Sequence, residues 1–186
     1  MRNRWVGWAA VAALLLLLAY VGSPYLGVRS FKNAALSADV DKLDATVDFP
    51  AVRESLKSQL STAMMREMAE SPEMKDNPFA GLGAIMMPAI IDKAVDAFVT
   101  PDGLSALAKG NRPQESPQSA KLQVDYDYEY INMDRFRVKI SNKDSSRGSA
   151  GFVFERRGLF TWKLIRIEIP PETFKEPVAA SATTQQ

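Results

Sequence analysis

The sequence predicts an α+β protein with an N-terminal transmembrane helix, and three observations support this fold class. Residues 5–21 form an uncharged apolar run. Apolar residues then recur at the helical period as far as residue 110, and from residue 121 they alternate with polar residues as in strands. Because the helices come first and the strands follow, we expect several helices packed on one face of a curved, cone-like antiparallel sheet of about four strands.

The apolar run at residues 5–21 follows Arg2 and Arg4. It rises about 25 Å at roughly 1.5 Å per residue, enough to cross a bilayer core of about 30 Å when flanking residues contribute. The basic residues before the run favour an N-terminus in the cytoplasm. We therefore expect a single-pass protein of the bacterial inner membrane, with residues 5–21 in the bilayer and the C-terminal domain in the periplasm of a Gram-negative cell.

A cleaved signal peptide is the competing interpretation of this run, because it has the same basic start and apolar centre. Cleavage requires small residues one and three positions before the cut. A cut after Gly22 places Tyr20 at the third position, and a cut after Ser23 places Pro24 just beyond the bond. Neither site is suitable, so we expect residues 1–22 to remain as a transmembrane anchor or uncleaved signal.

The rest of the chain has the length of one domain. We expect a single extracytoplasmic domain over residues 23–170, with a helical part (23–110), a polar linker (111–120) and a sheet (121–170). Residues 171–186 are expected to form a disordered tail. Because almost no linker separates the anchor from the first helix, the domain should sit against the membrane surface.

Capping residues mark the helix starts of the domain. Ser23, Asp39, Asp48 and Thr100 each precede a run with the helical period, and a proline lies in the first turn after three of them. A glycine at position 110 ends the last run. These signals predict helices over residues 24–38, 40–47, 50–69 and 101–110.

Residues 71–88 are interrupted by prolines and glycines, so we expect a long loop there and a helix over residues 89–99. Residues 79–87 within this loop are nevertheless apolar throughout. Exposing them would cost several kcal/mol at about 25 cal/mol per Å². We expect the segment to pack over the helical layer as one wall of an apolar cavity facing the first strand, with a lid or a membrane-dipping segment as the alternative.

The strands are predicted by alternation. Tyr126, Tyr128 and Tyr130 share one face of the first strand, and acidic residues occupy the other, solvent-facing side. A turn at residues 132–134 leads into the second strand, and a second hairpin forms around Arg157-Gly158. In the last strand the apolar phase slips near Leu164, which indicates a bulge or burial on both faces.

The aromatic face of this sheet is the candidate ligand site. Its residues either form core or line an aromatic ligand pocket, together with the apolar segment before residue 88. The candidate pocket residues are Tyr126, Tyr128, Tyr130, Phe152, Phe154, Trp162, Ile85 and Met86. The methionines of the central helices are interpreted as gap-filling residues or an adaptable apolar surface and not as copper ligands.

Composition excludes several function classes. The chain has no histidine and no cysteine, which removes catalytic triads, thiol nucleophiles and histidine or thiolate metal sites. Its net charge of +1, with basic and acidic residues intermixed, does not provide the basic surface typical of nucleic-acid-binding proteins. We predict no catalytic residue, no metal site and no cofactor. The favoured function is non-enzymatic binding of an envelope protein or an apolar ligand; the alternatives are a structural envelope component and, less favoured, a carboxylate-based enzyme.

One stretch also resembles a known family. Residues 29–57, R-S-F-K-N-A-A-L-S-A-D-V-D-K-L-D-A-T-V-D-F-P-A-V-R-E-S-L-K, and the later N-P-F and V-T-P-D-G-L segments resemble a proteobacterial family of single-pass membrane-anchored proteins catalogued as a domain of unknown function. The resemblance implies no assigned activity and no functional residues. The order of elements is also similar to the nuclear-transport-factor-like cone, whose enzymes use an Asp-His pair that this chain lacks.

Overall fold

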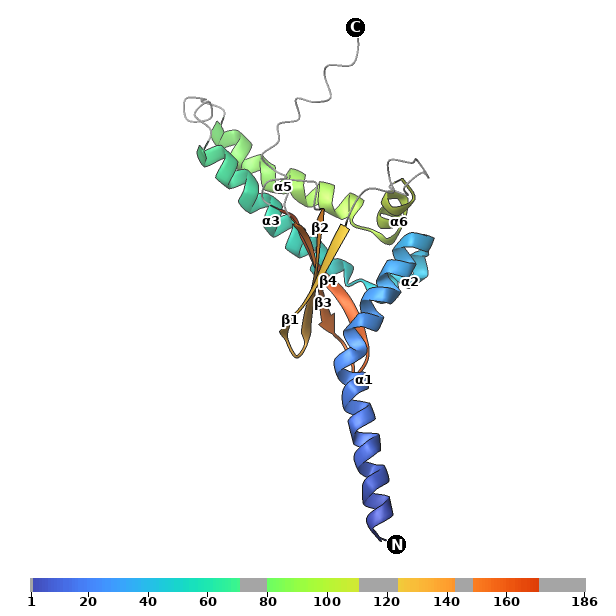
Figure 1. Cartoon of the computed structure of the whole chain (residues 1–186). Helices are drawn as coiled ribbons and strands as arrows, with labels where there is room; N and C mark the ends of the chain where they lie inside the picture. The colour runs from blue at the N-terminus through green and yellow to red at the C-terminus, as the bar shows by residue number, and fades with distance from the viewer. Residues whose placement is uncertain (1, 71–79, 111–123, 143–148, 171–186) are drawn as a thin grey trace.

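The computed structural model describes residues 2–70, 80–110, 124–142 and 149–170 (Figure 1). The predicted linker and tail, and Phe79, lie outside these ranges. The described elements are α1 (Arg2–Ser37), α2 (Val40–Thr46), α3 (Phe49–Glu70), α5 (Ala80–Phe98), α6 (Pro101–Gly110), β1 (Val124–Asn132), β2 (Arg135–Asn142), β3 (Ser149–Arg156) and β4 (Trp162–Glu168). Helices precede strands, which confirms the predicted α+β class.

The four strands form one curved, unclosed antiparallel sheet in the order β1-β2-β3-β4. In β4 the register changes: Val153 pairs with Arg166, but its neighbour Phe154 pairs with Leu164. Ile165 is therefore the extra residue of a bulge, which explains the phase slip seen in the sequence.

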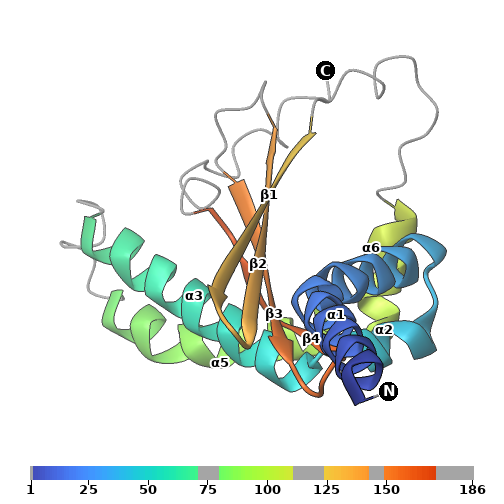
Figure 2. The ribbon, with the colours of Figure 1, turned by 60° about the horizontal axis from the view of Figure 1, so that its bottom comes forward.

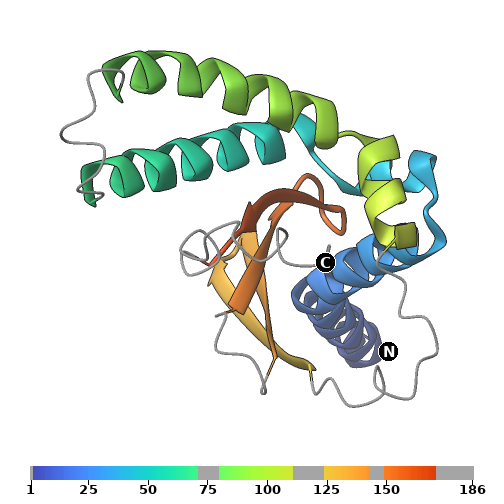
Figure 3. The ribbon, with the colours of Figure 1, turned by 90° about the horizontal axis from the view of Figure 1, so that it is seen from above.

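The helices cover one face of the sheet, as Figures 2 and 3 show. α1 and α3 contact the sheet directly, α5 lies antiparallel beside α3, and α2 and α6 pack near the C-terminal end of α1. The core lies between the helices and the sheet. Its buried members are Ala34, Leu43, Val47, Phe49, Val52, Leu56, Ile91, Val95, Phe136, Val138, Phe154, Trp162 and Leu164.

The opposite face of the sheet is polar and paired. Arg137 contacts Glu129 at 3.3 Å and Glu168 at 3.1 Å, and Lys139 contacts Glu129 at 3.2 Å. Acidic and basic side chains of neighbouring strands therefore neutralise one another on this side. The first strand thus has the solvent-facing acidic side that the alternation predicted.

Three of the predicted helix starts are confirmed by capping bonds. The backbone N–H of Lys42 donates to Asp39 Oδ1 at 3.1 Å, and that of Ala51 donates to Asp48 Oδ1 at 3.2 Å. The N–H of Gly103 donates to Thr100 Oγ1 at 2.9 Å. Each bond satisfies a backbone donor that the first turn of a helix leaves free.

The fourth predicted start, at Ser23-Pro24, was wrong. α1 runs without interruption from Arg2 to Ser37 with Pro24 inside it. Proline at this position removes the hydrogen bond that its N–H would give to the Tyr20 carbonyl. The Ser23 hydroxyl donates to that same carbonyl at 2.8 Å, so the acceptor stays satisfied and the helix continues.

The long loop predicted over residues 71–88 was also wrong in its second half, because α5 begins at Ala80 and contains Pro88. Glycines and proline disfavour a helix when taken alone. Ile91 and Val95 are buried against the core and Met87 packs beside them, so tertiary contact with α3 overrides the local preference.

The N-terminal part of α1 is the segment with the properties of a membrane span. Among the described residues, one helix is long and apolar enough to cross a bilayer. It covers Trp5–Ser37; its most apolar 18-residue stretch has a mean hydropathy of 2.0, and 6% of that stretch is buried. Residues 5–19 are exposed along their whole length, and contact with the domain begins at Tyr20.

Candidate functional site

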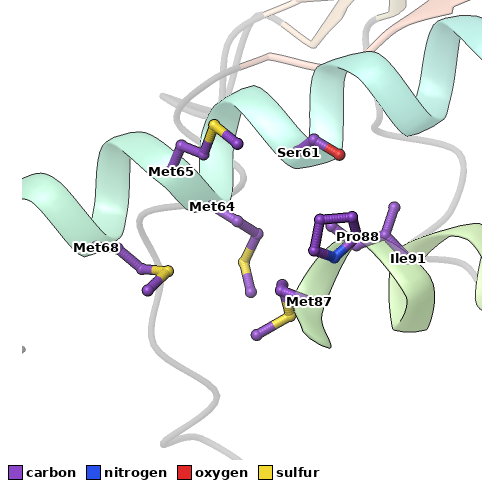
Figure 4. Close-up of a pocket in the computed structure, with 7 residues that line it drawn as sticks. All are labelled: Ser61, Met64, Met65, Met68, Met87, Pro88 and Ile91. Carbon is purple, nitrogen blue, oxygen red and sulfur yellow. The ribbon is translucent and has the colours of Figure 1, made fainter. Parts of the chain in front are cut away.

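A groove between α3 and α5 is the candidate site (Figure 4). We call it the methionine groove; its lining residues are Ser61, Met64, Met65, Met68, Met87, Pro88 and Ile91. Figure 4 shows Met64 and Met68 extending from α3 toward Met87 on α5. The groove is open to solvent on one side, and the space between these side chains is about 40 Å³.

The base of the α3–α5 hairpin is fixed by polar contacts. Lys57 Nζ lies 3.0 Å from Asp96 Oδ2 and 3.8 Å from Asp92 Oδ1. The Asp96 carboxylate accepts a hydrogen bond from Lys57 and raises the pKa of that ammonium above its usual value. Arg53 Nε donates to the Val99 carbonyl at 2.8 Å near the end of α5. The two helices are therefore aligned at one end, and the methionine groove lies beyond these contacts.

Besides Met65 in the groove lining, α5 exposes apolar side chains that are not part of the lining. Ile85 is 77% exposed, Met65 is 65% exposed, and Met86 and Ile90 are each 56% exposed. The prediction that residues 79–87 form a buried wall facing the first strand was therefore wrong for Ile85 and Met86. They lie on α5, which packs on α3 and not on the sheet (Figure 3). The hairpin thus presents an apolar surface that no described residue covers.

The tyrosines of β1 form a second, partly covered surface. Tyr126, Tyr128 and Tyr130 keep 42%, 45% and 40% of their area exposed. β1 is an edge strand, and α1 supplies contacts to these rings. The ring centroids of Tyr25 on α1 and Tyr128 lie 5.5 Å apart, and Lys32 Nζ lies 5.4 Å above the Tyr126 ring.

The other predicted pocket residues lie deeper. Phe154 and Trp162 are 1% and 2% exposed and belong to the core, and Phe152 is partly buried against it. The structure therefore brings the three tyrosines, Phe152, Phe154 and Trp162 onto one face of the sheet. It does not bring Ile85 and Met86 to them.

A cluster that the sequence analysis missed joins α1 to the sheet, and we call it the α1 junction: Tyr20, Ser23, Arg156 and Trp162. The Arg156 guanidinium lies 3.8 Å from the Tyr20 ring centroid and 4.3 Å from that of Trp162. Ser23 Oγ accepts from Trp162 Nε1 at 2.8 Å and from Arg156 Nη1 at 3.2 Å. The available signal was a serine before a mid-helix proline, which sequence reasoning assigned to a helix start.

Close packing also defines this junction. A Cβ atom on Gly27 would lie 2.6 Å from the Trp162 Cβ, so only glycine lets α1 approach β4 this closely. Tyr130, on β1, donates from its hydroxyl to the Val21 carbonyl, and burial is the main cause that raises the pKa of this phenol. α1 is thus hydrogen-bonded to both edge strands of the sheet, β1 and β4.

Several of the described ionisable groups form pairs at the surface. The pKa of the Glu129 carboxyl is lowered, first by its hydrogen bond with Lys139, and that of Asp39 is lowered, first by Lys42. Among the described residues, no three histidine, cysteine, aspartate or glutamate side chains gather closely enough to hold a metal ion. The site is therefore defined by apolar shape and not by titratable chemistry.

One family model matches the part of the chain that contains the helices. The family model "Protein of unknown function (DUF2939)" matches residues 13–107, half of the 186-residue chain. The chain belongs to this family. The matched region contains the segments on which the resemblance was based, includes the methionine groove, and ends before β1.

No curated protein and no solved structure matches the chain. The proteobacterial source and the likeness to the nuclear-transport-factor-like cone therefore stay predictions. DUF2939 membership itself assigns no site residue and no activity.

Proposed function

We propose that this DUF2939 protein is a single-pass inner-membrane protein of a Gram-negative bacterium whose periplasmic domain binds an apolar helix of a partner protein in the methionine groove. The observation that carries the proposal is the methionine-lined groove on a helical hairpin whose apolar side chains Met65, Ile85, Met86 and Ile90 are exposed. Soluble surfaces rarely leave large contiguous apolar patches uncovered. The lining is also rich in methionine, whose flexible thioether adapts to different partner side chains.

The shape of α1 supports a retained anchor. Ser23 and Pro24, next to the two candidate cut sites, are buried and helical. Proteolysis favours exposed, irregular backbone, so burial at these positions disfavours cleavage. The exposed residues 5–19 then have no role in the fold, and a bilayer is the environment that suits them.

The direction of the α3–α5 hairpin supports a protein partner. Figure 1 shows the free end of the hairpin on the side of the domain away from the N-terminal end of α1. With α1 crossing the bilayer, the groove lies on the part of the domain far from that membrane. The membrane-dipping alternative for residues 79–87 is thereby disfavoured.

The size of the groove favours a partner helix over an enclosed small ligand. A volume of about 40 Å³ holds roughly three water molecules at 10–15 Å³ each. A lipid or drug-sized ligand would not be enclosed. Two antiparallel helices with an apolar trough between them can instead receive the apolar face of a third helix.

The proposed role is non-enzymatic. The chain lacks histidine and cysteine, the usual acid–base and nucleophilic groups. Among the described carboxylates, those of Asp39 and Glu129 have a shifted pKa, and their lysine partners lower it. A general acid needs the opposite shift, toward neutral pH.

The groove is tested by site-specific photocrosslinking of the full chain in intact cells. A photoreactive phenylalanine analogue at Ile85 should give a discrete protein adduct. The same analogue at Phe98, also on α5 and 69% exposed, is the matched control and should give none.

Dependence on the groove makes this test specific. Met65→Glu, in the lining, should abolish the Ile85 adduct, whereas Thr62→Glu, on the exposed side of the same helix, should leave it unchanged. Equal adducts at Ile85 and Phe98, or an Ile85 adduct insensitive to Met65→Glu, would refute the proposed groove function.

The topology is tested independently. Alkaline phosphatase fused to the C-terminus should be active, because it folds only outside the cytoplasm, and mass spectrometry should find the N-terminal residues on the protein in isolated membranes. A mature N-terminus near Ser23, or a reporter active only in the cytoplasm, contradicts the proposed anchoring.

A further inference from the structure

The two turns at one end of the sheet carry exposed apolar side chains. The turn from β1 to β2 contains Met133, which is 77% exposed, and the turn from β3 to β4 contains Leu159, which is 71% exposed. Ile131 and Phe160 beside them are 41% and 46% exposed. We call these four side chains the turn surface. Figure 1 shows both turns directed toward the N-terminal half of α1.

Arg156 connects both turns to the same part of α1. Its Nη1 donates to the Leu159 carbonyl at 2.7 Å, and its Nη2 donates to the Met133 carbonyl at 3.2 Å. The same guanidinium stacks on Tyr20 and bonds Ser23. The turn surface therefore lies beside residues 20–23 of α1, where the exposed apolar helix enters the domain.

The length of α1 makes this position significant. Residues 5–19, which stand free of the domain, rise about 22 Å at roughly 1.5 Å per residue. A bilayer core is about 30 Å thick, so about 8 Å of hydrocarbon remains to be matched. Tilting α1 would only increase the shortfall, because a tilted helix spans less depth. The missing depth falls on residues 20–24, the level of the turn surface.

We propose that the turn surface inserts into the outer leaflet of the bilayer that α1 crosses, at the boundary between headgroups and acyl chains. This inference rests on the proposed anchoring by α1 and is independent of the methionine groove. The charges beside the turns set the depth. Asp134 is paired with Arg156 at 3.5 Å, and Arg157 is paired with Glu155 at 2.9 Å and with Asp48 at 2.7 Å. The exposed charges of Asp134 and Arg157 reach the headgroups, the Arg156 guanidinium stays enclosed by its partners, and the apolar side chains enter the acyl boundary.

The absence of cysteine from the chain allows a direct measurement of depth. Met133→Cys and Leu159→Cys are labelled with an environment-sensitive fluorophore, and the full chain is reconstituted into phosphatidylcholine–phosphatidylglycerol vesicles containing acyl-chain spin-labelled lipid. Both probes should lose most of their fluorescence to a shallow spin label and less to a deep one.

Two further positions separate the possible results. Leu14→Cys, within the apolar run, should be quenched most by the deep label, and Met65→Cys, of similar exposure but at the methionine groove, should not be quenched. Quenching at Leu14 without quenching at Met133 and Leu159 would overturn the inserted turn surface and leave the anchor intact. Lack of quenching at Leu14 would overturn the anchor and this inference together.

Discussion

Two regions at opposite ends of the domain, the turn surface beside the α1 junction and the methionine groove, expose apolar side chains to a similar degree. They differ in the contacts that position these side chains. At the α1 junction, the Arg156 guanidinium is held by backbone carbonyls, Ser23 and two aromatic rings. At the methionine groove, the described contacts are between flexible apolar side chains, and the polar contacts of Lys57 lie at the other end of the hairpin. Firm positioning suits a surface that meets a bilayer at a set depth, and deformable packing suits a partner helix.

The largest expected effect comes from Trp162 in the α1 junction. Trp162→Ala removes a side chain that is 2% exposed and should lower the free energy of unfolding by about 3–5 kcal/mol. Met65→Ala at the groove should change it by less than about 0.5 kcal/mol, because the side chain is mostly exposed. Urea unfolding of the full chain in detergent micelles, followed by circular dichroism, measures both. Similar losses for the two variants would show that the ends do not differ.

Gly27 should come next. Gly27→Ala forces a methyl group against Trp162 and should cost about 1–3 kcal/mol in the free energy of unfolding. Gly22→Ala is the control in the same helix, because a Cβ there meets nothing within 4 Å. It should be neutral or stabilise by roughly 0.5–1 kcal/mol through helix propensity. A harmless Gly27→Ala would mean that α1 does not press on β4.

Ser23→Ala should cost a similar or smaller amount, about 1–3 kcal/mol, because it leaves the Trp162 N–H, an Arg156 donor and the Tyr20 carbonyl short of a partner. Ser37→Ala serves as its control, since that hydroxyl, on an exposed residue near the end of α1, donates to the Asn33 carbonyl. It should change the free energy of unfolding by less than about 0.5 kcal/mol. The two melting curves should therefore separate; superimposable curves would remove Ser23 from the junction.

The smallest expected effects on stability are electrostatic. They differ between the sheet and the α3–α5 hairpin in the pH range over which each ion pair stabilises the fold. The lowered pKa of Glu129 stabilises the fold above the ordinary carboxyl value, about 4.3, and this contribution is lost as the pH falls through the folded pKa. The raised pKa of Lys57 stabilises the fold below the ordinary lysine value, about 10.4, and this contribution is lost as the pH rises through the folded pKa. Lys139→Met should raise the pKa of Glu129 in a carboxyl NMR titration without altering that of Lys57. An unchanged Glu129 titration would contradict the pairing.

Local patterns in the sequence were sufficient for most of the elements. The helical and alternating periods, with the capping side chains of Asp39, Asp48 and Thr100, determined the order of helices and strands because these signals act within a few residues. The phase slip near Leu164 indicated either a bulge or burial on both faces, and the structure contains the bulge, since an extra residue shifts the side-chain alternation of the strand.

The site depended on contacts between distant segments. Ser23-Pro24 has the local form of a helix start, but its hydroxyl replaces the bond that proline removes and its oxygen accepts from Trp162, far along the chain. The glycines and proline of residues 81–88 disfavour a helix until α3 packs against α5. Sequence alone determined which residues are apolar and where most helices and strands lie. Only the tertiary structure decided that residues 80–88 are helical and which apolar residues stay exposed, because both depend on what packs against them.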